Sequence, residues 1–175
     1  MQIKTLGILA VASVFFGMAC SSSPRTSNVS YEDHVKDSLK QADLSDISVS
    51  EDKDKNTITL SGKVHSEDAK QDAGRIAQSA AGTRIIVNEL SVQPVGAESE
   101  AKDIAKNSDD AIEKNYEAAL IADGLNKEHI SYDAKNGVLK LAGSVRSVPQ
   151  RTEAQKIAQA IPNVEQVVNQ IEIKR

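Results

Sequence analysis

The sequence predicts an α+β protein made of two tandem domains of similar size, and three observations support this prediction. An apolar N-terminal segment sets the first 19 residues apart, which leaves 156 of the 175 residues for folded structure. In those 156 residues the only aromatic side chains are three tyrosines, so the cores must be built mainly from Ile, Val, Leu and Ala. A stretch of 62 residues also recurs later in the chain without a gap. A repeat of this length predicts two small domains rather than one larger one.

The N-terminal segment has the layout of a secretory signal peptide. Lys4 is its only charged residue, and residues 5–19 are uncharged and mostly apolar. A basic start followed by an apolar run of this length is typical of a signal peptide, and the run is short for a membrane span. We therefore predict a signal peptide over residues 1–19.

The only cysteine of the chain, Cys20, follows this segment directly. Together with the three residues before it, Gly-Met-Ala, it resembles a bacterial lipobox, although Gly17 stands where this motif usually has Leu. The resemblance implies cleavage before Cys20 and lipidation of this residue, with palmitate among its acyl chains. Each buried CH₂ of an acyl chain adds about 0.8 kcal/mol to membrane binding. Residues 20–29 would then form a lipidated tether. The alternative is an ordinary signal peptide that leaves Cys20 as a free thiol.

The internal repeat aligns residues 31–92 with residues 112–173 at a constant offset of 81 positions, with 15 identities in the 62 pairs. The identical pairs include Leu39 and Leu120, Leu44 and Leu125, Gly62 and Gly143, Val64 and Val145, Ile76 and Ile157, and Asn88 and Asn169. Because identical pairs occur along the whole length of the alignment, the repeat is a duplicated domain rather than a shared motif.

Each copy contains the same succession of periodic patterns. Apolar residues four positions apart predict a first helix, which in the second copy should begin at Asn107 or Ser108. Alternating apolar residues on either side of a turn-rich segment then predict a β-hairpin. A second helix should follow the candidate N-caps Ser66 and Ser147, and a final apolar strand closes each copy.

Short motifs recur in both copies. A glycine lies between paired aliphatic residues (LSGKV and LAGSV), a serine precedes the second helix, and the copies close on VNELSV and VNQIEI. These motifs resemble the BON family, named for bacterial osmotically inducible and nodulation proteins. The resemblance implies tandem two-layer domains, each with the order helix-strand-strand-helix-strand and a three-stranded sheet. We place the two domains at residues 30–93 and 111–175, joined by a polar, acidic linker at residues 94–110.

A search for catalytic or metal-binding residues finds no convincing set. The three histidines occupy unrelated positions in the two copies, and none belongs to a paired metal-binding motif. The acidic residues 51–54 lack the spacing of a calcium loop and include a lysine that would oppose a cation. The sequence therefore predicts no enzyme, no cofactor and no metal site. Without residues 1–19 the chain carries 20 basic and 25 acidic side chains, net −5, which argues against a nucleic-acid partner.

The two copies differ in charge and in exposed apolar residues. The first copy carries 8 basic and 12 acidic side chains, net −4, whereas residues 112–175 carry 9 and 8, net +1. At matched positions the second copy has Ile121 in place of a lysine and Val148 in place of a glutamate, and it also carries Arg146 and Arg151.

These four residues, Ile121, Arg146, Val148 and Arg151, form the candidate lipid-binding set. Apolar side chains beside cations suit an anionic lipid surface, at which each nearby Lys or Arg contributes about 1 kcal/mol. Two alternatives are open: these side chains pack against the first copy, or they have no special role.

The BON resemblance implies binding of phospholipid, with an anionic lipid expected, or of another envelope surface. Our first hypothesis is a lipid-anchored phospholipid-binding module at the periplasmic face of the outer membrane, supporting envelope integrity or osmotic stress tolerance. Ser21 after Cys20 favours sorting to that membrane. The second hypothesis is a structural adaptor that binds envelope proteins or cell-wall assemblies. Binding of the acyl-free protein to anionic vesicles would separate the two.

Overall fold

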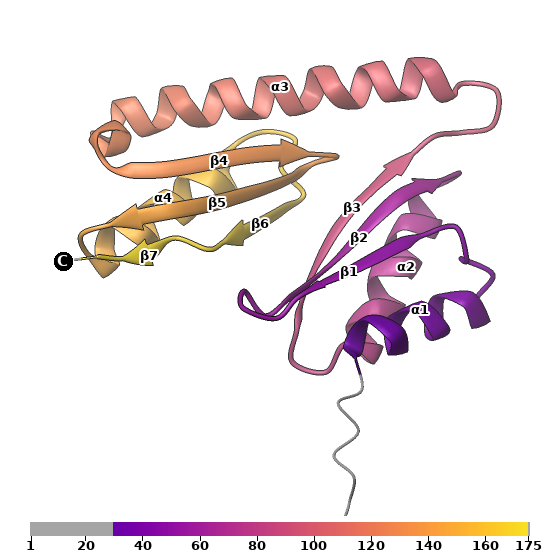
Figure 1. Cartoon of the computed structure of the whole chain (residues 1–175). Coiled ribbons are helices and arrows are strands. Elements are labelled where there is room, and N and C mark those ends of the chain that lie inside the picture. The colour runs from indigo at the N-terminus through magenta and orange to yellow at the C-terminus, as the bar shows by residue number, and fades with distance from the viewer. Residues whose placement is uncertain (1–29, 175) are drawn as a thin grey trace, which may run out of the picture.

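The computed structural model describes residues 30–174, which form two domains connected by one long helix (Figure 1). The first domain contains, in order, α1 (Tyr31–Gln41), β1 (Ser48–Asp52), β2 (Thr57–Val64), α2 (Glu67–Ala80) and β3 (Ile85–Val92). Strands β1 and β2 form an antiparallel hairpin. Strand β3 pairs in parallel with β2 after the α2 crossover, which gives the strand order β1-β2-β3.

The second domain repeats this order. It contains α3 (Glu98–Ala122), a short 3₁₀ helix η1 (Leu125–Lys127), β4 (His129–Lys135), β5 (Val138–Val145), α4 (Val148–Ala160), β6 (Gln166–Asn169) and β7 (Glu172–Ile173). Strands β4 and β5 are antiparallel, and both β6 and β7 pair in parallel with β5. Each sheet has helices on one face, so each domain has two layers. The predicted α+β fold with two tandem domains is confirmed.

The third strand of the second domain is divided into two pieces, β6 and β7, where the sequence predicts one. The cause lies at Asn169, whose side-chain oxygen accepts a hydrogen bond from the backbone N–H of Ile171 at 3.1 Å. This local bond competes with the ladder at the break, while the pairing register with β5 is the same on both sides of it. The equivalent bond in the first domain, from the Leu90 N–H to Asn88, is longer at 3.4 Å, and β3 stays continuous.

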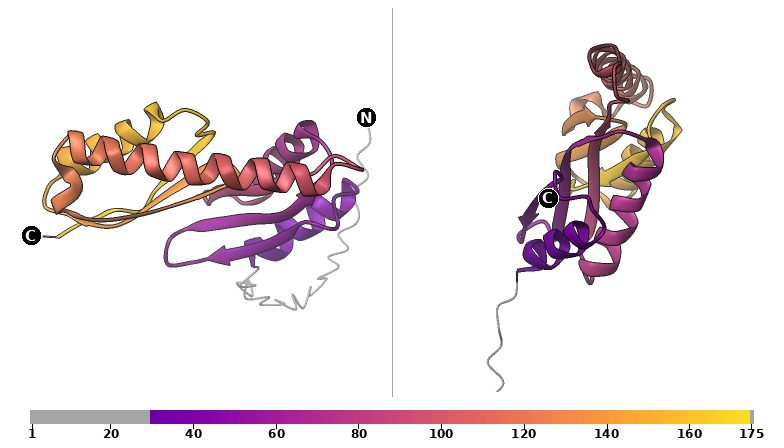
Figure 2. Two further views of the ribbon diagram at one scale, coloured as in Figure 1. Left: turned by 90° about the horizontal axis from the view of Figure 1, so that it is seen from above. Right: turned by 90° about the vertical axis from the view of Figure 1, so that its right-hand side faces the viewer.

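Helix α3 corrects the expectation for the connecting segment. The sequence predicts an irregular linker at residues 94–110 and a helix start at Asn107 or Ser108, but the helix begins at Glu98. The segment after Glu98 contains neither Pro nor Gly and is rich in Ala, Glu and Lys, which have high helix propensity. Acidic residues in the first turn add favourable charge at the helix N-terminus. Seen from above, α3 extends from the second domain alongside the first (Figure 2).

Helix α3 is attached to the second sheet through Asp109, which directly follows its added turns. Its carboxylate accepts hydrogen bonds from the backbone N–H groups of Asn136 at 2.8 Å and Gly137 at 3.1 Å. These two residues form the β4–β5 turn and have positive φ angles of 48° and 81°. The contact therefore closes a turn whose N–H groups point outward, and it fixes the helix to the hairpin.

The two predicted helix caps are confirmed. The Ser66 hydroxyl accepts a hydrogen bond from the Ala69 N–H at 3.1 Å, and Ser147 does the same from Gln150 at 3.4 Å, so both serines cap their helices. Gly143 has a φ of +95°, and a Cβ there would collide with the carbonyl oxygen of the neighbouring strand. Glycine at this position is required by the close passage of β4 and β5.

Each domain has its own core. The first contains Val35, Leu39, Ile47, Val49, Ile58, Leu60, Val64, Ala73, Ala77, Ala81, Ile86 and Leu90. The second contains Ile112, Tyr116, Leu120, Leu125, Leu139, Leu141, Val145, Ala154, Ile157, Ala158 and Ile171. Tyr116 is fully buried, as its spacing predicts, and its hydroxyl donates a hydrogen bond to the Ala154 carbonyl at 3.2 Å.

The two domains meet on the sheet faces that their own helices leave uncovered. A separate apolar cluster joins Val87 of β3 to Val138 and Val168 of the second sheet, and all three are at most 2% exposed. Beside it, the side chain of Gln166 donates to the Ile86 carbonyl at 2.6 Å and accepts from the Asn88 N–H at 3.3 Å. This side chain thus satisfies the open backbone edge of β3, which has no further strand neighbour.

Charged groups complete this interdomain contact. Glu89 is 4% exposed and forms ion pairs with Lys135, at 2.9 Å, and with Lys140. In the other direction, the Lys70 ammonium group lies 2.7 Å from the carboxylate of Glu165 and 3.0 Å from the Asn136 carbonyl oxygen. Each domain therefore contributes a buried charge that is paired only when the other domain is in place.

Candidate functional site

The candidate residues lie mainly at the end of the second domain that points away from the first. The last turns of α3, the end of β5, the start of α4 and the C-terminal end of the chain meet there (Figures 1 and 2). We call this region the distal end. It presents side chains from segments that are far apart in the sequence.

Two of the four predicted residues are brought together through Glu128. Arg146 lies with its Nε atom 3.8 Å from the Glu128 carboxylate, and its side chain is 78% exposed. Ile121, which is 56% exposed, lines the same pocket as Glu128. Glu128 itself accepts a hydrogen bond from the Gln150 side chain at 3.0 Å, which ties the start of α4 to this group.

Val148 and Arg151 occupy successive turns of α4. Val148 is the first residue of this helix and is 61% exposed. Arg151 is also exposed, and its backbone carbonyl accepts a hydrogen bond from the Asn169 side chain at 3.4 Å, which ties this part of α4 to the end of β6. The distal end therefore gathers Ile121, Arg146 and Val148, and Arg151 lies three positions further along α4.

The sequence analysis missed three residues of the distal end. Ile173 is 41% exposed at the end of β7, next to the exposed Lys174, and Lys127 lies on the surface of η1. Ile173 and Val145 are partners in the sheet, which places Ile173 near the end of β5. The repeat alignment contained no signal for Ile173, because its counterpart Val92 is apolar too. Ile173 is a surface residue only because β7 lies at the distal end of the second domain.

The structure excludes one of the alternatives for the candidate set. If Ile121 and Val148 packed against the first copy they would be buried, but both are more than half exposed. The contact between the domains uses Val87, Val138 and Val168 instead. An exposed apolar residue beside exposed cations is compatible with a surface that takes part in binding.

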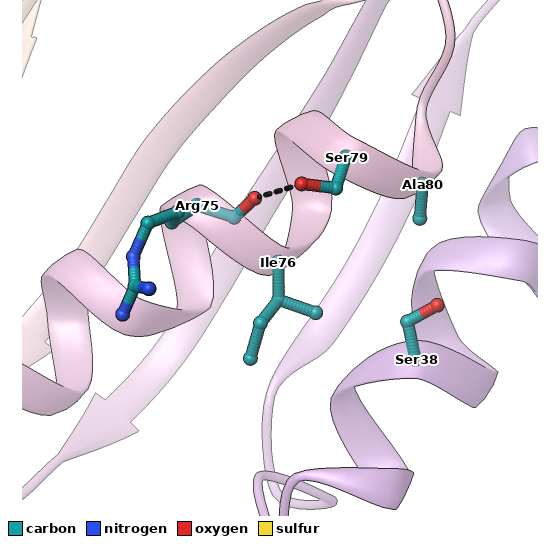
Figure 3. Close-up of a pocket in the computed structure, with 5 residues that line it drawn as sticks. All are labelled: Ser38, Arg75, Ile76, Ser79 and Ala80. Atoms are coloured by element: carbon teal, nitrogen blue, oxygen red, sulfur yellow. Dashed lines mark hydrogen bonds between the residues drawn. The ribbon is translucent and has the colours of Figure 1, made fainter.

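A second surface feature lies in the first domain, in the crease between α1 and α2 (Figure 3). The cavity has a volume of about 310 Å³ and is lined by Ser38, Arg75, Ile76, Ser79 and Ala80. Its only charged side chain, Arg75, pairs with Asp72 on the same helix, and the Ser79 hydroxyl donates to the Arg75 carbonyl at 3.0 Å. On α1, the Ser38 hydroxyl donates to the His34 carbonyl at 2.9 Å. The polar groups of this crease are thus satisfied within their own helices, and we assign no ligand to it.

The comparison with protein families decides the assignment. The profile described as the BON domain matches residues 29–94 and 108–175. The chain belongs to the BON domain family. Its two matched segments coincide with the two α+β units of the structure, so each unit is one BON domain.

A curated relative supports the same family. The chain is 30% identical over 139 residues to the osmotically-inducible protein Y of Escherichia coli strain K12. The aligned region covers 79% of this chain and 65% of that protein. The aligned region thus spans just under two thirds of the relative.

Among solved structures, the chain is similar to CdsD, described as a structural protein of the type III secretion system of Chlamydia trachomatis. For the C-terminal domain of CdsD the identity is 10%, the coverage 82% of this chain and 96% of that chain, and the TM-score 0.35. For a second CdsD structure the identity is 9%, the coverage is 81% of this chain and 91% of that chain, and the TM-score is 0.37. At these values the likeness adds nothing to the assignment.

Two further findings concern the described part of the chain. Between residues 30 and 174, no group of three or more His, Cys, Asp or Glu side chains is arranged to hold a metal ion. Within the same residues, no helix is both long enough and apolar enough to cross a membrane. The predicted signal peptide and the lipidation site Cys20 lie outside the described residues.

Proposed function

We propose that this protein is a periplasmic envelope protein whose second BON domain binds phospholipid through its distal end. Membership of the BON family and similarity to an osmotically inducible protein support a role in the cell envelope under osmotic stress. The observation that carries the lipid proposal is the surface itself, where Ile121, Val148 and Ile173 are exposed next to Arg146.

The energetics of such a contact favour a membrane surface. Burial of an isoleucine or valine side chain contributes about 1.5–3 kcal/mol when it is complete, and each basic residue adds about 1 kcal/mol at an anionic membrane. Two or three partly buried apolar side chains with two cations therefore give weak, reversible binding. Stable attachment needs a second signal, and acylation of Cys20 supplies it in this proposal.

The test of lipid binding uses the chain from Cys20 onward with Cys20→Ser, so that no acyl chain contributes. We expect this protein to float with vesicles that contain phosphatidylglycerol. Ile121→Lys and Val148→Glu restore the residue types of the first copy and should each weaken binding about tenfold, because an apolar contact is lost. Arg146→Ala with Arg151→Ala should reduce the dependence of binding on salt. Undiminished binding by all of these folded variants would reject the distal end as the contact surface.

Two exposed residues elsewhere provide matched controls. Ile104, on the added turns of α3, is 68% exposed, and Val95, before that helix, is 79% exposed. Ile104→Lys and Val95→Glu make the same chemical changes outside the distal end. Both variants should bind the vesicles as the parent protein does.

The anchoring step has its own test. Cys20→Ala should prevent acylation and processing, so that the protein no longer fractionates with the outer membrane. Mass spectrometry of the parent protein should show an acylated Cys20 at the N-terminus of the mature chain. A free thiol at Cys20, or cleavage at another bond, would overturn the lipoprotein proposal and leave vesicle binding to be judged separately.

A protein-binding adaptor is the second candidate function, and a different surface favours it. A cavity of about 640 Å³ lies between the domains and α3, and its lining includes Leu90, Pro94 and the exposed Ile104. If this surface binds an envelope protein, Ile104→Lys should abolish the crosslinks of the protein in cells, whereas Ile121→Lys should leave them intact. The reverse pattern would reject the adaptor function.

A further inference from the structure

A pocket of about 300 Å³ opens at the distal end, between the last turns of α3 and strand β4. Its walls are apolar, formed by Leu120, Ile121, Leu125 and Ile130. Ile121 is also the exposed apolar residue that we place at the lipid surface, so the pocket opens beside that surface.

A buried carboxylate lines this pocket. The Glu128 side chain is only 10% exposed. One of its oxygens accepts the hydrogen bond from Gln150, but the nearest cation to the other oxygen is Arg146 at 3.8 Å, which is too long for a hydrogen bond. This second oxygen is not sealed inside the protein, so a donor that enters the pocket can reach it.

Two further residues make the pocket attractive to a cation. Glu117 lines it from α3, and the Tyr132 ring lines it from β4, whereas no Lys or Arg side chain lines it. Burial raises the pKa of the Tyr132 hydroxyl, and the charges of Glu117 and Glu113 raise it further, which reflects the negative potential around this ring. An aromatic face next to two carboxylates is a favourable place for a positive charge.

The first BON domain provides an internal reference. A pocket of about 440 Å³ lies at the same place in the repeat, between α1 and β1. There Lys36 stands at the position of Glu117, and Ile47 stands at the position of Glu128. The fold therefore produces the hollow in both domains, but the first domain lines it with Asp37 beside two lysines, Lys36 and Lys40, whereas the second lines it with two carboxylates and no cation.

We propose that this pocket binds the primary ammonium group of a zwitterionic phospholipid head group, of the phosphoethanolamine type, while Arg146 contacts its phosphate. This inference rests on the proposed lipid-binding function and names the head group. Glu128 and Glu117 accept hydrogen bonds from the ammonium group, and Tyr132 covers one side of it. The Arg146 side chain is 78% exposed and its Nε atom lies 3.8 Å from the Glu128 carboxylate, so its guanidinium group can donate to a phosphate beside the pocket.

The lining also distinguishes a primary from a quaternary ammonium group. A primary ammonium carries three N–H donors and needs acceptors, which the two carboxylates provide. A quaternary group has no donor and is recognised by several aromatic faces, whereas this pocket has only Tyr132. The pocket should therefore favour phosphatidylethanolamine over phosphatidylcholine.

The experiment uses the chain from Cys20 onward with Cys20→Ser and vesicles with a constant fraction of phosphatidylglycerol. The remaining lipid is phosphatidylethanolamine, its N-methyl or N,N-dimethyl form, or phosphatidylcholine. Binding should weaken in this order, by about tenfold in total, because each methyl group removes a donor. A graded series controls for membrane packing, which changes between the two end members.

Glu128→Gln is the decisive variant. It keeps the side-chain shape and an oxygen for Gln150, so the domain should stay folded, which thermal unfolding by circular dichroism will check. Glu117→Lys reproduces the first domain. Both variants should bind the four vesicle types equally while they keep their binding to phosphatidylglycerol. Lys36→Glu, which makes the reverse change in the first domain, should leave the lipid preference unchanged.

The outcomes separate the two proposals. Equal binding of the parent protein to all four vesicle types overturns the ammonium site and leaves the lipid-binding function standing. If the protein binds none of the vesicles, the lipid-binding function is overturned. A lipid is then also excluded as the molecule that carries the ammonium group. Soluble phosphoethanolamine then tests the pocket alone: shifts of the Glu128 and Tyr132 amide resonances that phosphocholine does not produce support it, and unchanged resonances overturn it.

Discussion

The two BON domains place equivalent residues in opposite surroundings. Lys70 and Arg151 occupy the same position near the start of the second helix of each repeat. Lys70 is 6% exposed and forms its ion pair with Glu165 of the other domain, whereas Arg151 is exposed to solvent. The same position is therefore an internal contact in one copy and a free surface in the other.

Neighbouring positions show the same difference. Glu67 and Val92 of the first domain line the cavity between the domains, and their counterparts Val148 and Ile173 are exposed at the distal end. These outer positions of the first repeat's contact are thus open on the second, although Val168, the counterpart of the contact residue Val87, is itself buried between the domains.

Charge makes the contact specific for one pairing. Glu89 pairs with two lysines of the second domain, but its counterpart Gln170 has no charge to offer. Lys70 pairs with Glu165, whereas the counterparts Arg151 and Arg84 would repel each other. The duplicated face of the second domain therefore does not reproduce the interdomain contact with another copy of the chain.

The largest expected effect comes from the core residue that differs most between the domains. Tyr116 stands where the first domain has Val35, and both are fully buried. Tyr116→Val should lower the free energy of unfolding of the second domain by about 3 kcal/mol, because it leaves a cavity and removes the hydrogen bond to Ala154. Hydrogen exchange followed by NMR should show faster exchange in the second core only. A loss below about 1 kcal/mol would mean that the second core repacks as the first one is packed.

The next largest effect should come from Glu89→Gln, which gives the first domain the residue type of the second. Lys135 and Lys140 then lose their partner at a buried position. We expect the free energy of unfolding, measured with urea, to fall by about 2 kcal/mol. The loss is moderate because Glu89 is buried but the two lysines are partly exposed. The matched change Gln170→Glu should alter stability by less than about 0.5 kcal/mol. Equal effects would show that the interdomain contact does not depend on this charge.

Lys70 and Arg151 provide a smaller and more direct comparison. Lys70→Met should lower the free energy of unfolding by about 1 kcal/mol, because the Asn136 carbonyl loses its hydrogen-bond donor. The loss should be no larger, because the exposed Glu165 carboxylate can turn to water. Arg151→Met should change stability by less than about 0.5 kcal/mol, because its side chain is exposed. Both values can be measured by urea unfolding at neutral pH. If Arg151→Met lowered the free energy of unfolding more than Lys70→Met does, our assignment of Lys70 to an internal contact and of Arg151 to a free surface would be wrong.

The smallest effect concerns pH. Burial raises the pKa of the Glu89 carboxyl group, but hydrogen bonds and charge from Lys140 and Lys135 outweigh burial and hold that pKa below its usual value. A carboxyl group with a lowered pKa in the folded state stabilises the protein above its unfolded pKa of about 4.3, and this stabilisation is lost as the pH falls through the folded pKa. The difference in urea midpoint between the parent protein and Glu89→Gln should therefore shrink below about pH 4. A constant difference down to about pH 3 would contradict this account.

Local features of the fold were accessible from the sequence. The spacing of Tyr116 places it on the apolar helix face, and Ser66 and Ser147 are caps because a serine before a helix satisfies the N–H groups of its own first turn. The BON resemblance was found in the same way, from residues close together in the chain. The start of α3 was missed because its added turns lack an apolar stripe, and the contact of Asp109 with the β4–β5 turn is not visible in a local window.

The candidate site was predictable only in part. Comparison of the copies identified Ile121, Arg146 and Val148, because a charged residue replaced by an apolar one stands out in an alignment. Ile173 did not stand out, and Glu128 looked unremarkable beside a histidine. The role that we give Glu128 depends on the burial of its side chain between η1 and the start of α4, and on the distance from its carboxylate to Arg146.

By itself the sequence determined the duplication, the order of helices and strands, and the composition of the two cores, because each depends on the periodicity of residues along one segment. The tertiary structure decided which face of each repeat is covered. Val87, Val138 and Val168 alternate with core residues on their strands, and the sequence does not say what packs on that second face. That contact depends on side chains far apart in the chain, and so does the exposure of Val148 and Ile173 at the distal end.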